Sequence, residues 1–504
     1  MSFKACVKNS ITPLTWLALI ILAALLVRCY HITFPLNDAH AFRQTQTAGL
    51  IRDFYRDGIN FLYPSIITLG KPGYVVLEFP LYQAISAVLY KIIIPDIIIA
   101  RSLSIFFSLL SILFVYRLTL KFLDKRAAIF ASFFFAFAPL AIFYNRVPMP
   151  DSLTVLLSLV MLDFLISGIN EEKNSFLIFG IIAACLGLVM KSPYIAPLYL
   201  PIAYVIFRQK QSFKSLLSVR FMIAFLIPFM VMILWQQHAN AVNEIYFNTN
   251  NYPFNYLYSS VIVKLKPFNA WYFGTIDQSL EFSNYMIIWQ RLSQEILSGA
   301  GVFPLAIGFF AVIRGKAGLF FYVWLFSVLC SVVLFFNLNI IHDFYQMPLV
   351  PILSIFCGAG LSQFIDFFRN KKTICAIITV FMVFYLFKTY TFTPKLFKES
   401  NNLVQVGQFI DTSIEKNAMI ATSLPKDDVW DPQLMYYADR HGFAVPHRYL
   451  SKSMIEYLKN KQVKYLVVVD FEGEDNTVNA MLSHYKVVAK NERVKIFDIS
   501  CYRQ

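Results

Sequence analysis

The chain has 504 residues, of which 58% are hydrophobic and only 15% are charged. Soluble domains are about 45–50% apolar and about 25% charged, so this composition excludes an ordinary soluble protein and predicts a chain that crosses a membrane several times. The net charge of +14 does not indicate nucleic-acid binding. Residues 391–504 hold 15 basic and 14 acidic side chains, counted from the sequence, and the other basic groups cluster in short loops between apolar segments.

Eleven apolar segments have roughly the length needed to cross a bilayer. They lie at about 11–30, 99–120, 127–145, 152–168, 176–190, 193–207, 219–237, 300–313, 317–337, 347–365 and 373–388. The first ends at Arg28 without a small-residue cleavage site, so we expect an uncleaved span and not a removed signal peptide. A further apolar stretch, 75–94, is ambiguous because Glu78 and Pro80 interrupt it.

The basic residues decide whether 75–94 spans the membrane. If it does not span and the N-terminus is cytoplasmic, 16 of the 29 Lys and Arg side chains before residue 391 fall in cytoplasmic loops, counted from the sequence. If it spans, these clusters lie outside, against the positive-inside rule. We therefore predict a polytopic α-helical membrane domain over 1–390 with about 11 spans, in which 75–94 lies along the outer surface. The outer loops are then 31–98 and 238–298.

The region from 391 to 504 is predicted to be a small soluble α/β domain outside the cytoplasm. Helical patterns at 406–416 and 453–461 alternate with strand patterns at 418–423 and 465–470, and a final pair of strands is expected at 485–489 and 493–499. Strands that alternate with helices favour a compact α/β layer.

Two acidic residues, Asp38 and Asp151, are the candidate catalytic groups. Asp38 comes a few residues after the first span, and Asp151 lies between two later spans. A carboxylate at a membrane surface is suited to take a proton from an acceptor hydroxyl. Each aspartate could instead be the N-cap of the helix that follows it, at 39–55 or from 152 onward.

Cationic side chains near these acids are candidates to bind a phosphate. Gly70 and Pro72 flank Lys71 and imply a turn that aims its ammonium group, since a phosphate leaving group needs a nearby cation. The further candidates are His40, Arg43, Arg101 and Arg146. Contacts with lipid phosphates, snorkelling and structural ion pairs could explain the same residues. Glu78 is a candidate too, although a salt bridge would equally explain a carboxylate in an apolar stretch.

Two other stretches could recognise a phosphate or a sugar. Residues 342–348, which include His342 and Tyr345, precede an apolar span and could also form a plain loop. The loop at 238–298 is rich in tyrosine and asparagine, which suits sugar binding but also an interfacial aromatic belt. No cysteine pair has metal-binding spacing and no carboxylate cluster is dense, so we expect neither metal nor cofactor.

Several motifs together resemble the GT-C superfamily of polyprenyl-phosphate-sugar-dependent glycosyltransferases. The likeness is greatest to family 39-like enzymes, which include protein O-mannosyltransferases and lipid A aminoarabinose transferases. The motifs are Asp38 to Ala48, Arg52 to Tyr55, Leu62-Tyr63-Pro64, Lys71 to Tyr74, Glu78-Phe79-Pro80, Arg101, Arg146 to Asp151, and His342 to Pro348 with Pro351. The resemblance covers roughly residues 10–390. Many relatives have a second acid where this chain has Ala39.

The resemblance implies a function and roles for the residues. The chain would move a sugar from a polyprenyl-phosphate donor to a hydroxyl on a glycan, lipid or protein of the cell envelope, at the outer face of the cytoplasmic membrane. It implies that Asp38 is the general base, that Asp151 supports it, and that Lys71 contacts the lipid phosphate. The partners are then the donor, the acceptor and membrane lipids, with no nucleic acid. A transporter or flippase of lipid-linked sugars is the alternative.

Overall fold

The computed structural model describes residues 12–171, 173–250, 270–313, 319–368, 370–398, 403–425, 431–470 and 476–501. The chain divides into two compact units. We call Met1–Ile32, Ala100–Trp235 and Phe268–Phe397 the helical unit, and Thr33–Ile99, Gln236–Pro267 and Lys398–Gln504 the α/β unit. The C-terminal region therefore does not form a unit of its own, because it belongs to the same unit as the first predicted outer loop.

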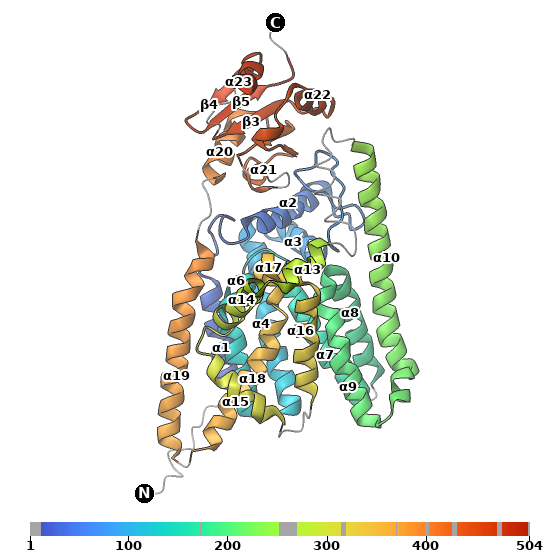
Figure 1. Cartoon of the computed structure of the whole chain (residues 1–504), viewed down its shortest axis with the longest axis vertical. Coiled ribbons are helices and arrows are strands. Elements are labelled where there is room, and N and C mark those ends of the chain that lie inside the picture. The colour runs from blue at the N-terminus through green and yellow to red at the C-terminus, as the bar shows by residue number, and fades with distance from the viewer. Residues whose placement is uncertain are drawn as a thin grey trace. The chain divides into compact units, whose positions relative to one another are not determined.

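The helical unit consists of helices joined by short turns (Figure 1). Its helices are α1 (Pro13–Arg28), α4 (Ile97–Phe122), α5 (Lys125–Phe137), α6 (Pro139–Tyr144), α7 (Asp151–Asn170), α8 (Asn174–Ile195), α9 (Tyr199–Lys210), α10 (Val219–Asn250), α12 (Ala270–Phe273), α13 (Ile276–Leu280), α14 (Phe282–Gln290), α15 (Val302–Ile313), α16 (Phe320–Leu334), α17 (Phe336–Ile341), α18 (Leu349–Asp366) and α19 (Lys371–Phe392). Helix α4 begins, and α10 ends, in the α/β unit. Each of the eleven predicted apolar segments coincides with one or two of these helices.

Six helical stretches in the described residues are long and apolar enough to cross a membrane, and three shorter apolar helices accompany them. The six are Ile97–Phe122, Asp151–Asn170, Asn174–Gln209, Val219–Tyr246, Leu349–Asp366 and Thr373–Phe397. The predicted polytopic helical architecture is therefore confirmed. The stretch 174–209 contains two of the predicted segments, separated by a break described below.

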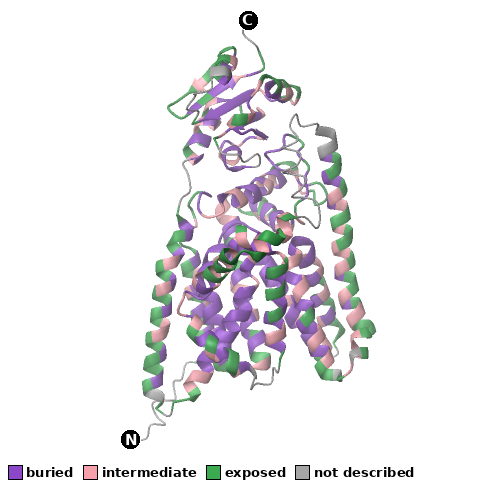
Figure 2. Cartoon of the chain, viewed as in Figure 1, coloured by how far each residue is buried: buried purple, intermediate pink, exposed green. Residues whose placement is uncertain are grey.

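Burial separates central from peripheral helices (Figure 2). In the most apolar 18 residues of α7 and of α18, 78% of the residues are buried, whereas the share is 11% in α10 and 22% in α19. The exposed side chains of α10 and α19 are nonetheless mostly apolar, as expected for surfaces that face lipid chains.

Helices α15 and α18 approach each other closely through glycine. A Cβ at Gly308 would lie 1.9 Å from the carbonyl oxygen of Phe356, and a Cβ at Gly360 would lie 1.9 Å from that of Pro304. Small residues at such crossings let helix backbones touch in a membrane, where packing replaces the hydrophobic effect as the cause of association.

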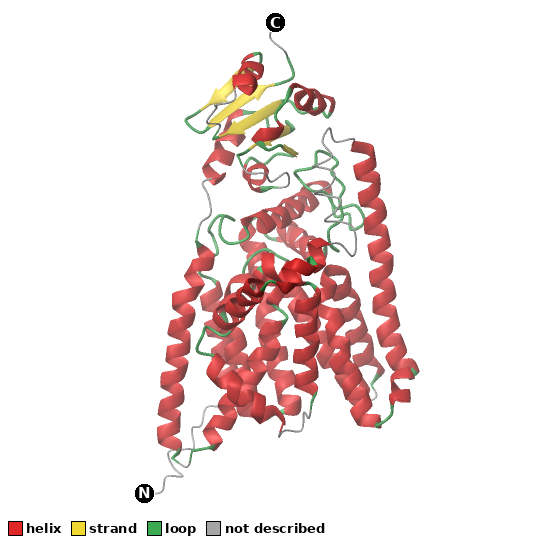
Figure 3. Cartoon of the chain, viewed as in Figure 1, coloured by secondary structure: helices red, strands yellow, loops and turns green. Residues whose placement is uncertain are grey.

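The α/β unit contains the only strands that the described residues form, apart from isolated bridges (Figure 3). Its strands are β1 (Ile420–Ser423), β2 (Gly442–Ala444), β3 (Tyr465–Val469), β4 (Lys486–Lys490) and β5 (Val494–Asp498), and its C-terminal helices are α20 (Leu403–Ser413), α21 (Gln433–Tyr437), α22 (Lys452–Asn460) and α23 (Asn476–Ser483). The sheet order is β2-β1-β3-β5-β4. Strand β1 is parallel to β2 and β3, and β5 is antiparallel to β3 and β4. The predicted α/β layer is confirmed.

The first predicted outer loop forms two helices of this unit, α2 (Ala41–Asp57) and α3 (Leu81–Ile92), which pack together. Helix α3 is the only helix within the ambiguous stretch 75–94, all of which the structure describes. Its 12 residues rise only about 18 Å, less than the ~30 Å of a bilayer core, so it is too short to span. Its position at the outer membrane surface remains a prediction.

Candidate functional site

Asp151 is the first residue of α7 and is completely buried. Its Oδ1 accepts a hydrogen bond from Lys191 Nζ at 2.6 Å. The hydroxyl of Tyr194 lies 2.6 Å from the same oxygen and 2.6 Å from the carbonyl oxygen of Phe344. A hydroxyl has one proton to donate, so Tyr194 bonds to one of these acceptors at a time. The aspartate is therefore held in one orientation by a buried ion pair.

Lys191 reaches Asp151 because helix α8 breaks at that point. Pro193 has no backbone N–H to donate to Val189, and its ring crowds that carbonyl. Lys191 accordingly has non-helical angles, φ −149° and ψ 87°. The ammonium group also lies over the rings of Phe344 and Tyr345, at 4.7 Å and 5.3 Å from their centroids. Aromatic faces of this kind stabilise a desolvated cation.

Two further carboxyl groups, those of Asp343 and Glu295, lie near this cluster. The hydroxyl of Tyr144 donates to the buried carboxylate of Asp343. Burial and the charge of Asp343 raise the pKa of the Glu295 carboxyl to about 7, while Arg291 acts in the opposite direction. Glu295 thus titrates near neutral pH, which is typical of functional carboxyl groups.

Several enclosed polar atoms in this part of the helical unit make no hydrogen bond to described residues. They are Asp151 Oδ2, Glu295 Oε2 and both side-chain polar atoms of Asn145. Buried polar groups are nearly always paired, so such a group of atoms is where water or a ligand is expected to bind.

The arginines predicted to bind phosphate contact the chain itself. Arg101 donates to the carbonyl of Ile32 at 2.7 Å, and Arg146 donates to that of His31 at 2.7 Å. Both arginines are completely buried, and Arg146 also lies over the ring of Phe397. These contacts fix the turn after α1. A role for either arginine toward a phosphate remains a prediction.

His342 and Tyr345 lie beside the Asp151 cluster. The His342 ring stacks on Phe344, with centroids 5.0 Å apart, and the Tyr345 ring contacts the Lys191 ammonium. Trp271, from the predicted aromatic loop, packs edge-on against His342. Of the tyrosines in the loop at 238–298, for which sugar binding was considered, Tyr252, Tyr256 and Tyr258 lie outside the described residues.

Asp38 lies in the α/β unit and is buried. It is not the N-cap of the following helix, because α2 begins at Ala41 and its N-cap is His40, at φ 55°. The alternative N-cap interpretation is therefore wrong, and it is wrong for Asp151 as well, since Pro150 is the N-cap of α7. The Asp38 carboxylate instead accepts a hydrogen bond from Gln44 Nε2, one turn into the helix.

Arg43 and Glu78 form an ion pair on the same unit. Glu78 also accepts a hydrogen bond from Gln83 at 3.2 Å. The expectation that a carboxylate in an apolar stretch is paired is confirmed. Lys71 is more than half exposed and lies 3.6 Å from the exposed Asp57 carboxylate, so this pair contributes little to stability.

The helical unit supplies Asp151, Arg101, Arg146, His342 and Tyr345, and the α/β unit supplies Asp38, His40, Arg43, Lys71 and Glu78. Within each unit the structure brings several of them together. In the described residues, no group of three or more His, Cys, Asp or Glu side chains is close enough to hold a metal ion.

Comparison with known proteins gives two further findings on the sequence. Residues 73–235, less than half of the chain, match the family model of dolichyl-phosphate-mannose-protein mannosyltransferases. None of the curated proteins matches the chain.

Comparison with solved structures gives matches over nearly the whole chain. ArnT from Cupriavidus metallidurans, solved with undecaprenyl phosphate bound, is 14% identical, with a TM-score of 0.67 over 96% of this chain and 98% of that one. The Archaeoglobus fulgidus oligosaccharyltransferase tethered to an acceptor peptide is 10% identical, with a TM-score of 0.55 over 93% of this chain and 70% of that one. The mycobacterial arabinofuranosyltransferase AftD is 13% identical, with a TM-score of 0.54 over 98% of this chain and 40% of that one.

The chain has the GT-C fold. The fold that the resemblance implied is thus confirmed. The sequence did not predict a role for four residues of the candidate site, Lys191, Tyr194, Glu295 and Gln44. A weak signal was present for the first, since Lys191 is a charged residue between two apolar segments and precedes Pro193.

Proposed function

We propose that the chain transfers one sugar from a polyprenyl-phosphate donor to a hydroxyl acceptor at the outer face of the cytoplasmic membrane. The observation that carries this proposal is the match over 96% of the chain to a structure solved with undecaprenyl phosphate bound. The family model over residues 73–235, which describes a dolichyl-phosphate-sugar-dependent transferase, points to the same donor class.

The proposed reaction exchanges one bond at the anomeric carbon. The acceptor oxygen attacks that carbon, the bond from the carbon to the phosphate oxygen breaks, and the lipid phosphate leaves with the electron pair. The acceptor proton goes to the Asp38 carboxylate, and attack opposite the leaving group inverts the anomeric centre. Gln44 would help to orient the Asp38 carboxylate, since its Nε2 donates a hydrogen bond to Oδ1.

Asp151 is proposed to support the site as an orienting acid. Because Lys191 and Tyr194 both approach its Oδ1, its Oδ2 keeps a free lone pair among the described residues. That oxygen can accept a hydroxyl of the sugar. Lys191 is a positioning residue, since it acts through Asp151.

The leaving phosphate needs cations at headgroup depth. Lys71 is the proposed first contact, because its ammonium group is exposed and only loosely paired with Asp57. Arg101, Arg146 and His342 are proposed to assist. Cations near the phosphate would stabilise the negative charge that develops as it departs.

The acceptor is a glycan, lipid A or a protein, and mass spectrometry of envelope glycolipids and glycoproteins with and without the gene distinguishes them. A sugar-bearing product that disappears with the gene supports the proposal. Movement of the donor across vesicles without any product would instead support a flippase.

Cysteine labelling tests the proposed topology. Ile85 lies in α3, and a cysteine at this position, in a chain without its native cysteines, should react from the outer side of the cytoplasmic membrane. Labelling only from the cytoplasm would contradict both the span arrangement and an outward-facing C-terminal domain.

A further inference from the structure

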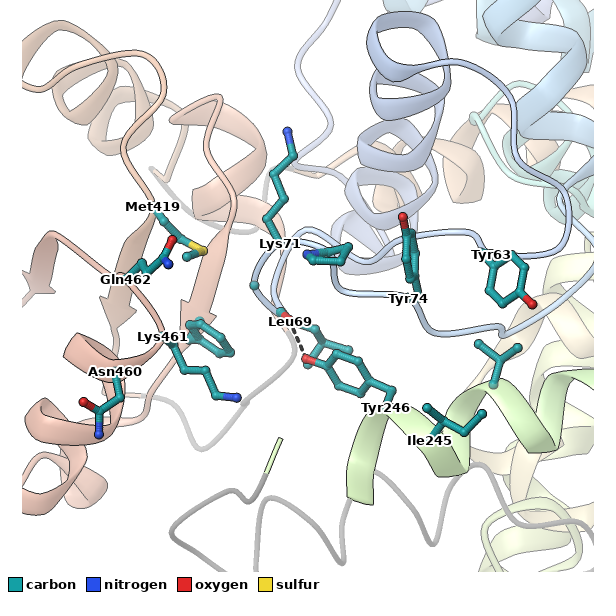
Figure 4. A pocket seen from close by; sticks show the side chains of 14 residues that line it. Tyr63, Leu69, Lys71, Tyr74, Ile245, Tyr246, Met419, Asn460, Lys461 and Gln462 are labelled. Carbon is teal, nitrogen blue, oxygen red and sulfur yellow. Dashed lines mark hydrogen bonds between the residues drawn. The ribbon is translucent and has the colours of Figure 1, made fainter. Parts of the chain in front are cut away.

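A cluster of charged side chains in the helical unit takes no part in the proposed reaction. It consists of Arg117 and Lys121 on α4 and of Asp163 and Ser167 on α7. The cavity of about 450 Å³ in the α/β unit is not independent of that reaction, because Lys71 is one of its lining residues (Figure 4). A carboxylate inside a spanning helix is costly and often marks a functional site, so the charged cluster needs an explanation.

The charged cluster lies far along the spanning helices from the candidate site residues of the helical unit. Asp163 is about 18 Å further along α7 than Asp151, because an α-helix rises about 1.5 Å per residue. Arg117 is about 24 Å further along α4 than Arg101 on the same basis. In the predicted topology this is the cytoplasmic end of both helices, where phospholipid headgroups meet the protein.

Lys121 balances the charge of the completely buried Asp163 carboxylate. Its Nζ lies 2.6 Å from Oδ1 of Asp163, and it donates to the backbone carbonyl of Asp163 at 2.8 Å and to Ser167 Oγ at 2.5 Å. An ammonium group has three protons, so these contacts occupy all of them. Lys121 and Asp163 therefore form an internal ion pair that leaves Lys121 no proton for a further ligand.

Arg117 adds a second positive charge to the same carboxylate, and nothing in the charged cluster balances it. Its Nη2 donates to Asp163 Oδ2 at 2.9 Å, the only hydrogen bond that its guanidinium makes to the described residues. The side chain is 55% exposed, and its Cζ lies 5.6 Å from the centroid of the Phe114 ring. A guanidinium has five N–H donors in a planar fork that fits two oxygens of a phosphate. Asp163 and Phe114 thus orient Arg117, while most of its donors remain available to an anion.

An apolar surface continues from Arg117 to the exposed face of α8. The ring of Phe114 packs against that of Phe164 with centroids 6.3 Å apart, and Phe164 packs against Phe179 at 5.7 Å. Phe179 and Ile182 are each about half exposed, and they share one face of α8 because they are three residues apart. We call Phe114, Phe164, Phe179 and Ile182 the apolar wall.

Close packing of α7 against α8 fixes the apolar wall. A Cβ at Gly168 would lie 2.8 Å from the backbone nitrogen of Leu177, and a Cβ at Gly180 would lie 2.5 Å from Cδ2 of Leu165. Helices that approach each other this closely in a membrane are held together by their packing. The rings on α7 and α8 therefore keep their relative positions.

We propose that the charged cluster and the apolar wall together bind one anionic phospholipid. Arg117 contacts its phosphate, and the apolar wall contacts an acyl chain. Charge complementarity favours an anionic headgroup, because Lys121 already balances Asp163 and the charge of Arg117 is left over. The adjoining apolar wall favours a lipid over free phosphate, since a phospholipid brings a phosphate and acyl chains to one place. This proposal does not depend on the proposed transfer reaction.

Native mass spectrometry of the full chain, purified in detergent and freed of lipid, tests this proposal. The probes are phosphatidylglycerol and phosphatidylcholine with the same acyl chains, and the anionic phosphatidylglycerol should bind more tightly. Arg117→Gln should weaken its binding about fivefold, the effect of one cation near a charged headgroup. Lys121 still pairs with Asp163 in this variant, so the chain should fold. Arg126→Gln is the matched control, because this exposed arginine is paired with Asp366, and it should bind like the unmodified chain.

A second pair of variants tests the apolar wall separately from the charge. Phe179→Ala should also weaken the binding of phosphatidylglycerol, whereas Phe310→Ala, which removes an exposed ring of α15, should not. Both rings are exposed, so neither change should prevent folding.

Competition and the controls show how the proposal would fail. Neither inorganic phosphate nor undecaprenyl phosphate should displace phosphatidylglycerol. Displacement by the first would mean a simple anion site, and displacement by the second would assign the surface to a polyprenyl lipid, so either would overturn the proposal. Equal binding of the two phospholipids, no effect of Arg117→Gln or Phe179→Ala, or equal losses in Arg117→Gln and Arg126→Gln would overturn it too.

Discussion

The two units hold their candidate site residues in different ways. In the helical unit, Asp151 and its partner Lys191 are buried and fixed by a break in α8. In the α/β unit, Lys71 is on a loop, exposed, and paired only at 3.6 Å. Buried charges tolerate no loss of a partner, whereas exposed charges can change partner at little cost. The helical unit is thus suited to orient groups, and the loop of the α/β unit to capture and release them.

The largest expected effect is that of Lys191→Met. The change leaves the buried Asp151 carboxylate without its cation, and broken buried ion pairs typically cost about 3–5 kcal/mol. We expect a large drop in the thermal unfolding midpoint in detergent. Lys173→Met removes an exposed partner of Glu171 and should leave the midpoint nearly unchanged. Equal effects of the two changes would erase the contrast between buried and exposed charges.

Gly70→Ala tests how closely the loop that carries Lys71 packs against Phe443 within the α/β unit. A side chain at φ +78° is strained, and its Cβ would clash with Phe443, so we expect a loss of about 2–3 kcal/mol. Gly58→Ala is the control, because Gly58 has φ +98° but nothing within 4 Å of the added Cβ. Thermal unfolding should show the larger loss for Gly70→Ala. A loss of equal size at Gly58 would mean that strain alone, and not the contact with Phe443, matters.

Glu295 should make the helical unit sensitive to pH. Below about pH 4 the carboxyl is protonated in both the folded and the unfolded chain. Between pH 4 and the folded pKa of about 7, only the unfolded chain releases the proton, so stability falls as pH rises. Glu295→Gln should therefore be more stable than the unmodified chain at pH 8, by about 1–2 kcal/mol, with little difference at pH 4. The exposed Glu281→Gln should show no such trend across a pH series of unfolding midpoints.

The smallest expected effect is that of Asp439→Asn on the α/β unit. Burial raises the pKa of Asp439, but hydrogen bonding from Arg56 and the charges of Arg52 and Arg56 outweigh burial and lower it overall. The stability that the ionised Asp439 contributes through these arginines is present above pH 4 and is lost as the pH falls through the lowered pKa. We expect a loss of about 1 kcal/mol or less at pH 7, which shrinks as the pH falls through the lowered pKa of Asp439. Asp366→Asn removes an exposed ion pair with one arginine, Arg126, and should lower the free energy of unfolding at pH 7 by less than Asp439→Asn does. A larger loss for Asp366→Asn would contradict this ranking.

Hydropathy and alternation revealed the spans and most of the C-terminal sheet, because long apolar stretches and buried strands such as 465–470 have strong local patterns. Strand β2 and helix α21 were not predicted, because they have only three and five residues, too few to show a periodic pattern of apolar residues. The pairing of Arg43 with Glu78 was left open because the partners are 35 residues apart. Lys191 was missed because only the folded break at Pro193 directs its ammonium group to Asp151.

The central claim is that Asp38 removes the acceptor proton while the lipid phosphate departs. The most direct test is the transfer rate of Asp38→Asn, measured by mass spectrometry of the product with purified protein and a polyprenyl-phosphate sugar. The account predicts a 10²- to 10⁴-fold loss with an unchanged unfolding midpoint, while Asp366→Asn, at an exposed position outside the proposed site, keeps its activity. Full transfer activity of Asp38→Asn would contradict the account.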